Sequence, residues 1–352
     1  MSYVVSRDFS MCFDVAFRVR MHSENKDDPG SLLECLPPID FCCIYGSTLH
    51  PNNHEKSKMV DYIMGVSDPL QWHNENLKMN KDHYASWMAH LGGAKLVTQV
   101  ADKVGVGVHF NPFVTYTGRL FKYGVVRMND LVEDILQWKK FYLSGRLQKP
   151  VRVVVDNLDI NNLNYVNLRA AVSAAPFLLP AKFTEANLYA KICSLSYMGD
   201  VRMLFAEDRN KVKTIVTGQF DLFASMYKQT LEGYAAKDVL KLSSLKRPSA
   251  PISQDCDLAA TQTLVSSLPS RIKSEMGIKL GDNKPPIQIE QELQGILINS
   301  REDATRSMTK VLRRTVLVSS ARQAVSGLLS VGGVNAARYL SSKMRKAWKS
   351  WT

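Results

Sequence analysis

Two short apolar runs in the first third of the chain carry residues whose types and spacing suit phosphate chemistry. The first run, residues 41–45, leads directly into Gly46 and Ser47, and the second, residues 60–66, contains the single acid Asp61. A glycine lets the backbone approach a phosphate closely, and a serine hydroxyl with neighbouring amides can donate hydrogen bonds to phosphate oxygens. The acid can bind Mg²⁺, a cation that proteins share with substrate phosphates. This spacing predicts a nucleotidyltransferase site.

The metal site needs a second ligand, and the sequence leaves its identity open. Nucleotidyltransferases carry two acids that alternate on one strand face, but Ile63 stands where the second acid would be. Asp68 could supply an oxygen from the loop after the strand, so we predict Asp61 and Asp68 as the Mg²⁺ ligands. The alternative is that Asp68 only caps a helix, because it directly precedes Pro69, a natural first helical residue.

The composition of the chain favours anionic partners and a reducing compartment. The 352 residues carry a formal net charge of +12, which suits nucleic acid, acidic lipid headgroups or phosphorylated substrates. The six cysteines show no paired spacing and no zinc pattern, so we expect reduced, buried thiols. No apolar stretch approaches the roughly 18 residues of a membrane span, so we expect a soluble or membrane-peripheral protein.

Periodicity divides the chain into an α/β unit followed by a mostly helical unit. We expect strands at residues 41–47, 58–66 and 150–155 and a hairpin of residues 106–116 and 120–127, with helices between them. A helix over 131–142 should end at Gly145. Beyond residue 156 we expect helices, a strand-like patch at 201–205 and a loop over 243–257. The predicted domains are residues 1–156, 157–305 and 306–352.

The last segment, residues 306–352, contains ten Lys and Arg residues and no acid. Several of its apolar residues fall on one helical face: Val318, Ala321, Val325, Leu328 and Leu329. Basic residues together with terminal tryptophans suit a helix that lies on an anionic bilayer. The alternative is a helix packed on its own domain.

Several blocks in the same order resemble one known family. They are residues 60–69, Trp72-His73, Asn76-Leu77, Asn80, His83-Tyr84, residues 118–120, residues 122–125, Tyr142, residues 145–151, residues 195–197, Gly199-Asp200, Arg202-Met203, Glu207-Asp208 and Lys211-Val212. The chain resembles the mitochondrial translocator assembly and maintenance protein family, the mitochondrial CDP-diacylglycerol synthases or phosphatidate cytidylyltransferases. The resemblance covers residues 36–215 well and the basic tail faintly.

The resemblance implies a fold, a reaction and a location. The fold is α/β: a nucleotidyltransferase-like mixed sheet with helices, then a mostly helical winged-helix-like domain and a C-terminal amphipathic helix that associates with membrane. The reaction converts CTP and phosphatidic acid to CDP-diacylglycerol and pyrophosphate with Mg²⁺, feeding cardiolipin synthesis. The implied location is the matrix side of the mitochondrial inner membrane, as a peripheral protein on an anionic membrane surface. No nucleic-acid partner is expected.

The reaction joins two polyanions, so it needs charge neutralisation and alignment more than a strong base. We expect Gly46 and Ser47 at the triphosphate. Lys122, Arg146 and Lys149 are candidate phosphate clamps. Further candidates are His73, which could bond a phosphate oxygen or be a core histidine, and Asp200 and Arg202, which could form a structural ion pair or act at the domain interface.

Two other functions fit part of the same pattern. One is a nucleotidyltransferase that acts on nucleic acid, which shares the Gly46-Ser47 turn and the basic charge. The missing second acid speaks against it, as does the lack of basic residues interleaved with stacking aromatics outside the tail. The other is a non-catalytic membrane assembly factor whose nucleotidyltransferase fold has decayed, and the missing acid favours it. An assay that compares phosphatidate and RNA as acceptors distinguishes the nucleic-acid enzyme from the lipid enzyme. A nucleotide-binding assay with and without Mg²⁺ distinguishes the non-catalytic assembly factor from the lipid enzyme.

Overall fold

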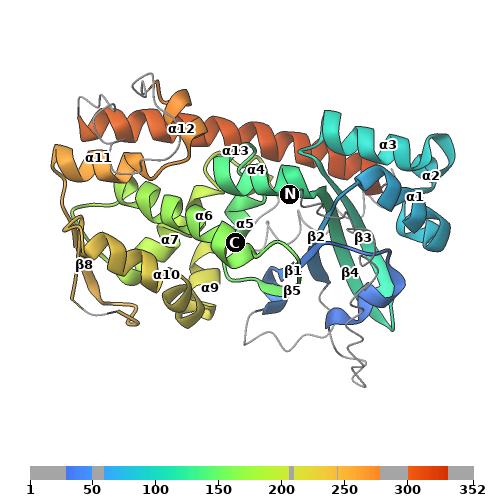
Figure 1. The fold of residues 1–352 in the computed structure, drawn as a ribbon, viewed down its shortest axis with the longest axis horizontal. Helices are drawn as coiled ribbons and strands as arrows, with labels where there is room; N and C mark the ends of the chain where they lie inside the picture. The colour runs from blue at the N-terminus through green and yellow to red at the C-terminus, as the bar shows by residue number, and fades with distance from the viewer. Residues whose placement is uncertain (1–28, 50–58, 206–209, 244, 278–299, 332–352) are drawn as a thin grey trace, which may run out of the picture.

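The computed structural model describes residues 29–49, 59–205, 210–243, 245–277 and 300–331. A five-stranded sheet with its helices forms one end of the molecule, and a mostly helical unit forms the other (Figure 1). One long helix, α13 (Arg301–Val331), runs along both. The expected α/β class is confirmed.

The larger sheet is mixed, with the strand order β3-β4-β2-β1-β5. Its strands are β1 (Phe41–Tyr45), β2 (Val60–Val66), β3 (Val108–Tyr116), β4 (Arg119–Arg127) and β5 (Arg152–Asp156). β2 and β4 are parallel, whereas the β1–β2, β1–β5 and β3–β4 pairs are antiparallel. The predicted hairpin is therefore confirmed as β3 and β4, and the other three predicted strands lie within a few residues of their expected bounds.

The two faces of this sheet bury different clusters because successive strand residues point to opposite sides. On β2, Tyr62 packs with Trp72 of α1 (Pro69–Met79), on the face that the helices α1, α2 (Ser86–Leu91) and α3 (Gly93–Gln99) cover. The next residue, Ile63, packs on the other face with Leu131 of α4 (Met128–Gln137) and Leu147 of α5 (Ser144–Leu147). The second face also carries Asp61, two positions before Ile63.

A buried carboxylate shapes the chain between α4 and α5. Asp134 accepts hydrogen bonds from five successive backbone amides, those of residues 140–144, at 2.6–3.1 Å. Trp138 takes a left-handed conformation with φ 52° and ends α4. The prediction of one helix over 131–142 that ends at Gly145 was therefore wrong, because these bonds turn the chain early, and Gly145 lies inside α5.

The second unit contains a small antiparallel sheet among helices. The sheet has the order β6-β8-β7. The elements in chain order are α6 (Ile160–Ala174), β6 (Lys182–Thr184), α7 (Glu185–Leu195), α8 (Arg202–Phe205), α9 (Lys211–Gly218), α10 (Phe220–Ala235), β7 (Leu240–Leu242), β8 (Pro251–Gln254), α11 (Leu258–Ser266) and α12 (Ser270–Glu275). The predicted loop over 243–257 was wrong in part, because buried Ile252 pairs β8 with both neighbouring strands.

The strand-like patch predicted at residues 201–205 is the helix α8. The carboxylate of Asp200 accepts a hydrogen bond from the backbone amide of Arg202 at 2.9 Å, which starts a helical turn. The expectation of a strand rested on the alternation of only five residues, which a short helix can also show.

Helix α13 connects the two units, and the domain boundary expected at residues 305 and 306 falls inside it. Met308 and Leu312 are buried in the core of the helical unit. Further along, Trp87 donates to the carbonyl of Leu329 at 3.1 Å, and Arg322 donates to the carbonyl of Lys103 at 2.7 Å. Residues 332–352 of the predicted tail lie outside the described residues. None of the helices in the described ranges combines the length and apolar character that crossing a membrane requires.

Candidate active site

Strand pairing brings the predicted residues Gly46, Asp61 and Lys122 together on the second face of the sheet, where β1 ends and β2 begins. Asp61 pairs with Tyr45, the residue before Gly46, across the antiparallel β1–β2 ladder. It also pairs with Lys122 across the parallel β2–β4 ladder. The Lys122 ammonium lies 3.4 Å from the Asp61 carboxylate, and the two side chains are 22% and 26% exposed. The sheet therefore holds a partly solvated acid and a cation beside the Gly-Ser turn.

The turn itself sits against the acid. Gly46 has φ +94°, and a Cβ at this position would lie 3.3 Å from Oδ2 of Asp61, so glycine suits both the conformation and the close approach. Ser47 begins the short 3-10 helix η2 (Ser47–Leu49). In this helix the hydroxyl of Thr48 is buried and has no hydrogen-bond partner among the described residues. A phosphate oxygen bound by the turn would supply that partner, and the sequence analysis did not single out Thr48.

A second group of charges surrounds the buried ring of Tyr142. The guanidinium of Arg146 lies 3.8 Å from the ring centroid, and that of Arg202 lies 5.9 Å from it. Arg146 also donates to the Tyr142 carbonyl. Burial alone would raise the pKa of Tyr142, but Arg146, Arg202 and Lys122 together outweigh it and lower that pKa. The site therefore has a positive potential in which an anion is favoured.

Arg146 lies between this group and the end of β1. Its guanidinium lies 5.3 Å from the ring of Tyr45, whose pKa burial raises to about 12. The Nε of Arg146 is buried without a hydrogen-bond partner in the described part of the chain. A buried donor of this kind carries a free-energy cost unless a ligand accepts from it.

Asp200 and Arg202 form an ion pair, which was one of the two alternatives predicted for them. Arg202 donates from Nε at 2.9 Å and from a terminal nitrogen at 2.5 Å to the two carboxylate oxygens of Asp200. Asp200 is buried, whereas the Arg202 side chain is about one-third exposed. The pair therefore fixes the guanidinium that faces Tyr142, and Asp200 acts on the site through Arg202.

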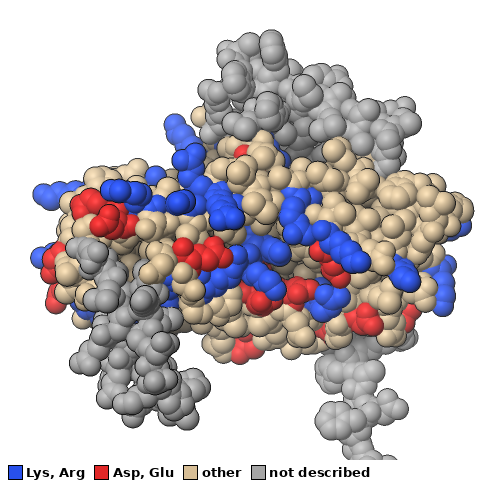
Figure 2. All heavy atoms as spheres, turned by 90° about the horizontal axis from the view of Figure 1, so that it is seen from above, with Lys and Arg blue, Asp and Glu red and all other residues tan. Residues whose placement is uncertain are grey.

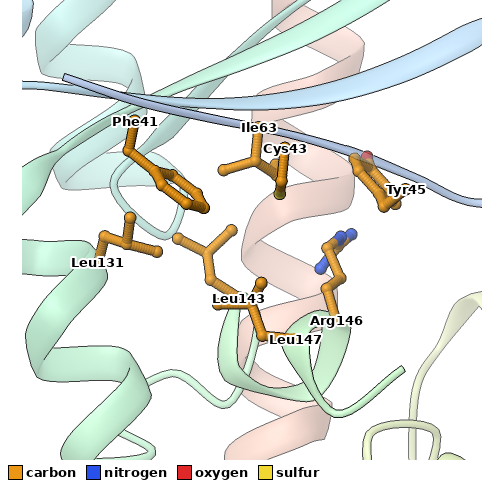
Figure 3. A pocket seen from close by; sticks show the side chains of 8 residues that line it. All are labelled: Phe41, Cys43, Tyr45, Ile63, Leu131, Leu143, Arg146 and Leu147. Atoms are coloured by element: carbon orange, nitrogen blue, oxygen red, sulfur yellow. The ribbon is translucent and has the colours of Figure 1, made fainter. Parts of the chain in front are cut away.

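An apolar pocket lies beneath these groups and has room for about one water molecule. Tyr45 and Arg146 stand at one end of it (Figure 3). Its other lining residues are Phe41, Cys43, Ile63, Leu131, Leu143 and Leu147. Burial raises the pKa of Cys43 to about 12, so this thiol stays protonated at neutral pH and is a poor nucleophile.

Comparison with known proteins identifies the family of this chain. Residues 30–346 match the family described as "Phosphatidate cytidylyltransferase, mitochondrial". The chain belongs to this family. Proteins of the same description from Mus musculus, Bos taurus and Schizosaccharomyces pombe are 32%, 35% and 30% identical to it. These alignments cover 89%, 89% and 88% of this chain and 92%, 92% and 80% of the relatives. A phosphatidate cytidylyltransferase is a nucleotidyltransferase, so the chain is an enzyme of that class.

Two residues predicted for the cytidylyltransferase site lie elsewhere. Asp68 follows the far end of β2, about 20 Å along the strand from Asp61, and caps α1 by accepting from the amides of Leu70 and Gln71. His73 is 1% exposed, and its Nδ1 lies 2.8 Å from the hydroxyl of Tyr84 on the opposite face of the sheet. The structure does not bring either residue to Asp61.

Of the two predicted Mg²⁺ ligands, Asp61 alone lies beside the Gly46 turn. Among the described residues no three His, Cys, Asp or Glu side chains form a cluster that could hold an ion. Mg²⁺ often takes only one or two carboxylates and completes its shell with substrate phosphates and water. Asp61, partly exposed beside the Gly46 turn, fits that role. Asp130 and Asp134 have protein partners of their own, since Asp130 pairs with Arg127 and Asp134 accepts hydrogen bonds from backbone amides.

Sequence reasoning missed the tyrosines of this candidate site. Tyr45 directly precedes the Gly-Ser turn, and Tyr142 stands four residues before Arg146, a spacing that could have shown the contact on a helical turn. The contact between Lys149 and Tyr197, at 5.0 Å from the ring centroid, joins residues that are far apart in the chain. No local signal could have shown it.

Proposed function

We propose that this chain transfers the cytidylyl group of CTP to phosphatidic acid and releases CDP-diacylglycerol and pyrophosphate. The names of its relatives support the substrates. The observation that carries the proposal is the assembly of Gly46, Asp61 and Lys122 by strand register, with Arg146 beside them. A glycine turn, one acid and several cations are what a nucleoside triphosphate and its metal require.

In the reaction, an oxygen of the phosphatidate phosphate attacks the α-phosphorus of CTP. A new P–O bond forms, the bond to the β-phosphate oxygen breaks, and pyrophosphate leaves with the bonding electrons. The attacking phosphate is already anionic, so no side chain has to remove a proton. The chain's own contribution is to align the two anions and to balance their charge with Lys122, Arg146 and Arg202.

Asp61 would hold Mg²⁺ against the triphosphate. The ion would neutralise charge on the phosphate oxygens. Asp61 also lies in an ion pair with Lys122, so the acid and the cation would act side by side. The backbone of the Gly46-Ser47 turn would donate to the same phosphates.

Topology supports the finer description of the fold. A strand that ends in a Gly-Ser turn, followed by an antiparallel strand that carries the acid, is the nucleotidyltransferase arrangement that we infer for residues up to 156. In the second unit the order α6, β6, α7, α9–α10, β7, β8, with β8 between β6 and β7, matches a winged-helix-like unit whose wing is the β7–β8 pair.

The membrane contact that we infer lies on the outer side of α13. In its second half the helix buries polar residues, Ser319, Ser320, Gln323 and Ser326, and exposes Leu317, Val318, Val325 and Leu328 by 42–52%. This is the reverse of a helix that is fully packed on its own domain. An exposed apolar strip of this kind suits insertion into the headgroup region of a bilayer.

Basic residues accompany the strip. Arg313 and Arg314 are exposed one turn before Leu317. Lys140 has its pKa lowered by partial burial and by the nearby cations Arg322, Lys139 and Arg271. Figure 2, seen from the α13 side, shows Lys and Arg side chains gathered across the middle of this face. We infer that an anionic bilayer docks here, on the matrix side of the mitochondrial inner membrane, and that the product feeds cardiolipin synthesis.

The proposed function can be tested with two aspartate variants. The purified full-length protein, given Mg²⁺, CTP and phosphatidate in vesicles, should form CDP-diacylglycerol. Asp61→Asn should lose activity by on the order of a hundredfold, because it removes the charge that binds the metal and pairs with Lys122. Product formation is followed with radiolabelled CTP.

Asp68→Asn is the matched control. Asparagine caps a helix about as well as aspartate, so this variant should keep both its stability and its activity within about twofold. An Asp61→Asn enzyme as active as the parent would overturn the metal assignment. An inactive Asp68→Asn enzyme of normal stability would show that the site includes the far end of β2.

A further inference from the structure

A second pair of cations lies next to the group around Tyr142, at the junction of the two units. The ammonium groups of Lys149 and Lys211 lie 5.0 and 5.3 Å from the ring centroid of Tyr197. Lys149 follows α5 of the first unit, and Lys211 begins α9 of the second. The junction therefore repeats one arrangement, in which a tyrosine ring contacts two cations, since Tyr142 contacts Arg146 and Arg202 in the same way.

The position of Lys149 is built into the packing between the units. Its ammonium donates to the carbonyl of Gly145 at 2.5 Å and to the hydroxyl of Ser196 at 2.8 Å. A Cβ on Gly145 would lie only 2.5 Å from Cβ of Ser196, so the two segments touch directly. These contacts fix the ammonium group, which reduces the entropy lost when it binds an anion.

The two cation groups start from neighbouring positions of the chain. Lys149 is three residues after Arg146, and its amide donates to the Arg146 carbonyl at 3.0 Å, so the two side chains leave one turn about 5–6 Å apart. The attacking oxygen must come within about 3–3.5 Å of the α-phosphorus. Two phosphates that close repel each other, so each one needs its own counter-charges.

The two groups have different neighbours. Arg146 adjoins Tyr45, next to the Gly46 turn and Asp61, so the group around Tyr142 lies on the side of the proposed nucleotide site. The loop that carries Tyr197 instead packs on α13. A Cβ on Gly199 would lie 3.0 Å from the Arg313 carbonyl, and the amide of Val201 donates to Ser320 at 3.2 Å. This places the second group beside the helix that we infer to face the bilayer.

We propose that Lys149 and Lys211, held against the ring of Tyr197, form the subsite for the phosphomonoester group of phosphatidate. The subsite deepens the function proposed above and rests on it. It assigns roles to Lys211 and Tyr197, which belong to the blocks that resemble the family but were not among the predicted site residues. The ring of Tyr197 keeps the two ammonium groups at a common anion and does not itself need to take part in the transfer.

The test uses Lys211→Met and Tyr197→Leu in the full-length protein, with Lys213→Met as the matched control. Lys213 is an exposed lysine on the same helix, two residues away. Lys211→Met and Tyr197→Leu should raise the KM for phosphatidate at least tenfold and leave the KM for CTP within twofold. Lys211→Arg and Tyr197→Phe should recover most of the lost affinity, because they restore the charge and the ring. Lys213→Met should change neither KM.

A binding measurement separates this subsite from the proposed reaction. Titration calorimetry with soluble dihexanoyl phosphatidate should show at least tenfold weaker binding to Lys211→Met than to the parent, even if no CDP-diacylglycerol forms. Pyrophosphate is the other anion that such a site could take, and its binding should be the same in both proteins. A variant that weakens pyrophosphate or CTP and leaves dihexanoyl phosphatidate unchanged would overturn the proposal, as would a variant that weakens none of them.

Discussion

At the scale of single residues, a buried polar network on the helix-covered face of the sheet is as distinctive as the site itself. Asn76 donates to the hydroxyls of Tyr84 and Tyr123, both at 2.8 Å, and His73 lies 2.8 Å from the same Tyr84 hydroxyl. The rings of His73 and His109 are 5.2 Å apart. Burial lowers the pKa of His73 well below its usual value and that of His109 from 6.5 to about 4. Both histidines are therefore neutral in the folded enzyme.

This network predicts a loss of stability in acid. Between pH 6.5 and 4 the unfolded chain binds a proton at residue 109 that the folded chain does not, so the free energy of unfolding falls as the pH falls. His109 alone should cost about 2 kcal/mol between pH 7 and pH 5. His109→Gln should remove this contribution from the pH dependence in urea denaturation curves and leave the part that His73 contributes. The exposed His90→Gln is the control, and an equal flattening in both variants would contradict the assignment.

The sequence predicted part of the candidate site at this scale. Gly46 and Asp61 could be found because each stands in a short segment whose local pattern shows a strand and its end. Asp68 and His73 were attractive for their chemical type, but a cap and a core contact use the same types. Only the position of a residue on a strand and the face to which it points separate these roles, and both depend on the whole sheet.

At the scale of elements, the one-turn helix α5 carries more of the site than its length suggests. It presents Arg146 toward Tyr45 and Tyr142, and Lys149 follows two residues after its end. The amides that Asp134 holds set its start, and Gly145 sets how close it lies to Ser196. The sequence could not show this element, because four residues have no periodicity and Gly145 resembled an ordinary helix end.

Gly145→Ala should therefore separate the two units at this contact. The added methyl group overlaps Ser196, so we expect about 1–3 kcal/mol of lost stability. A shift of about 1 Å in the adjacent cations should lower kcat/KM by on the order of a hundredfold. Gly233→Ala on α10 is the control, because its Cβ would meet no atom within 4 Å. Thermal unfolding and steady-state kinetics measure both effects, and normal kinetics in Gly145→Ala would contradict the role of this contact.

At the scale of the whole molecule, α13 holds the two units together and presents one side outward. The sequence showed a helical stripe in the right place, with Val318, Val325 and Leu328 on it. It could not show that the opposite, serine-rich side of α13 would be buried, because burial of small polar residues depends on partners such as the Tyr197–Arg202 loop.

The outward side predicts how the enzyme binds lipid. Val318→Asp combined with Val325→Asp should weaken binding to vesicles that contain anionic lipid by about tenfold or more, since both lost apolar contact and charge repulsion act against it. Leu222→Asp, at an equally exposed apolar position on α10, should leave binding unchanged. Vesicle sedimentation of the full-length protein measures this. Equal losses in both variants would mean that α13 is not the contact.

The contact of Gly199 with the backbone of α13 has a consequence for the proposed path of the lipid. With the bilayer against the outer side of that helix, the loop that carries Tyr197 sits on its inner side, and a helix with its side chains is about 10 Å thick. A phosphatidate headgroup must rise by about that much to meet CTP. Each methylene drawn out of the hydrocarbon layer costs about 0.8 kcal/mol unless protein covers it. In the proposed arrangement, part of the work of this enzyme is therefore to draw phosphatidate out of the bilayer.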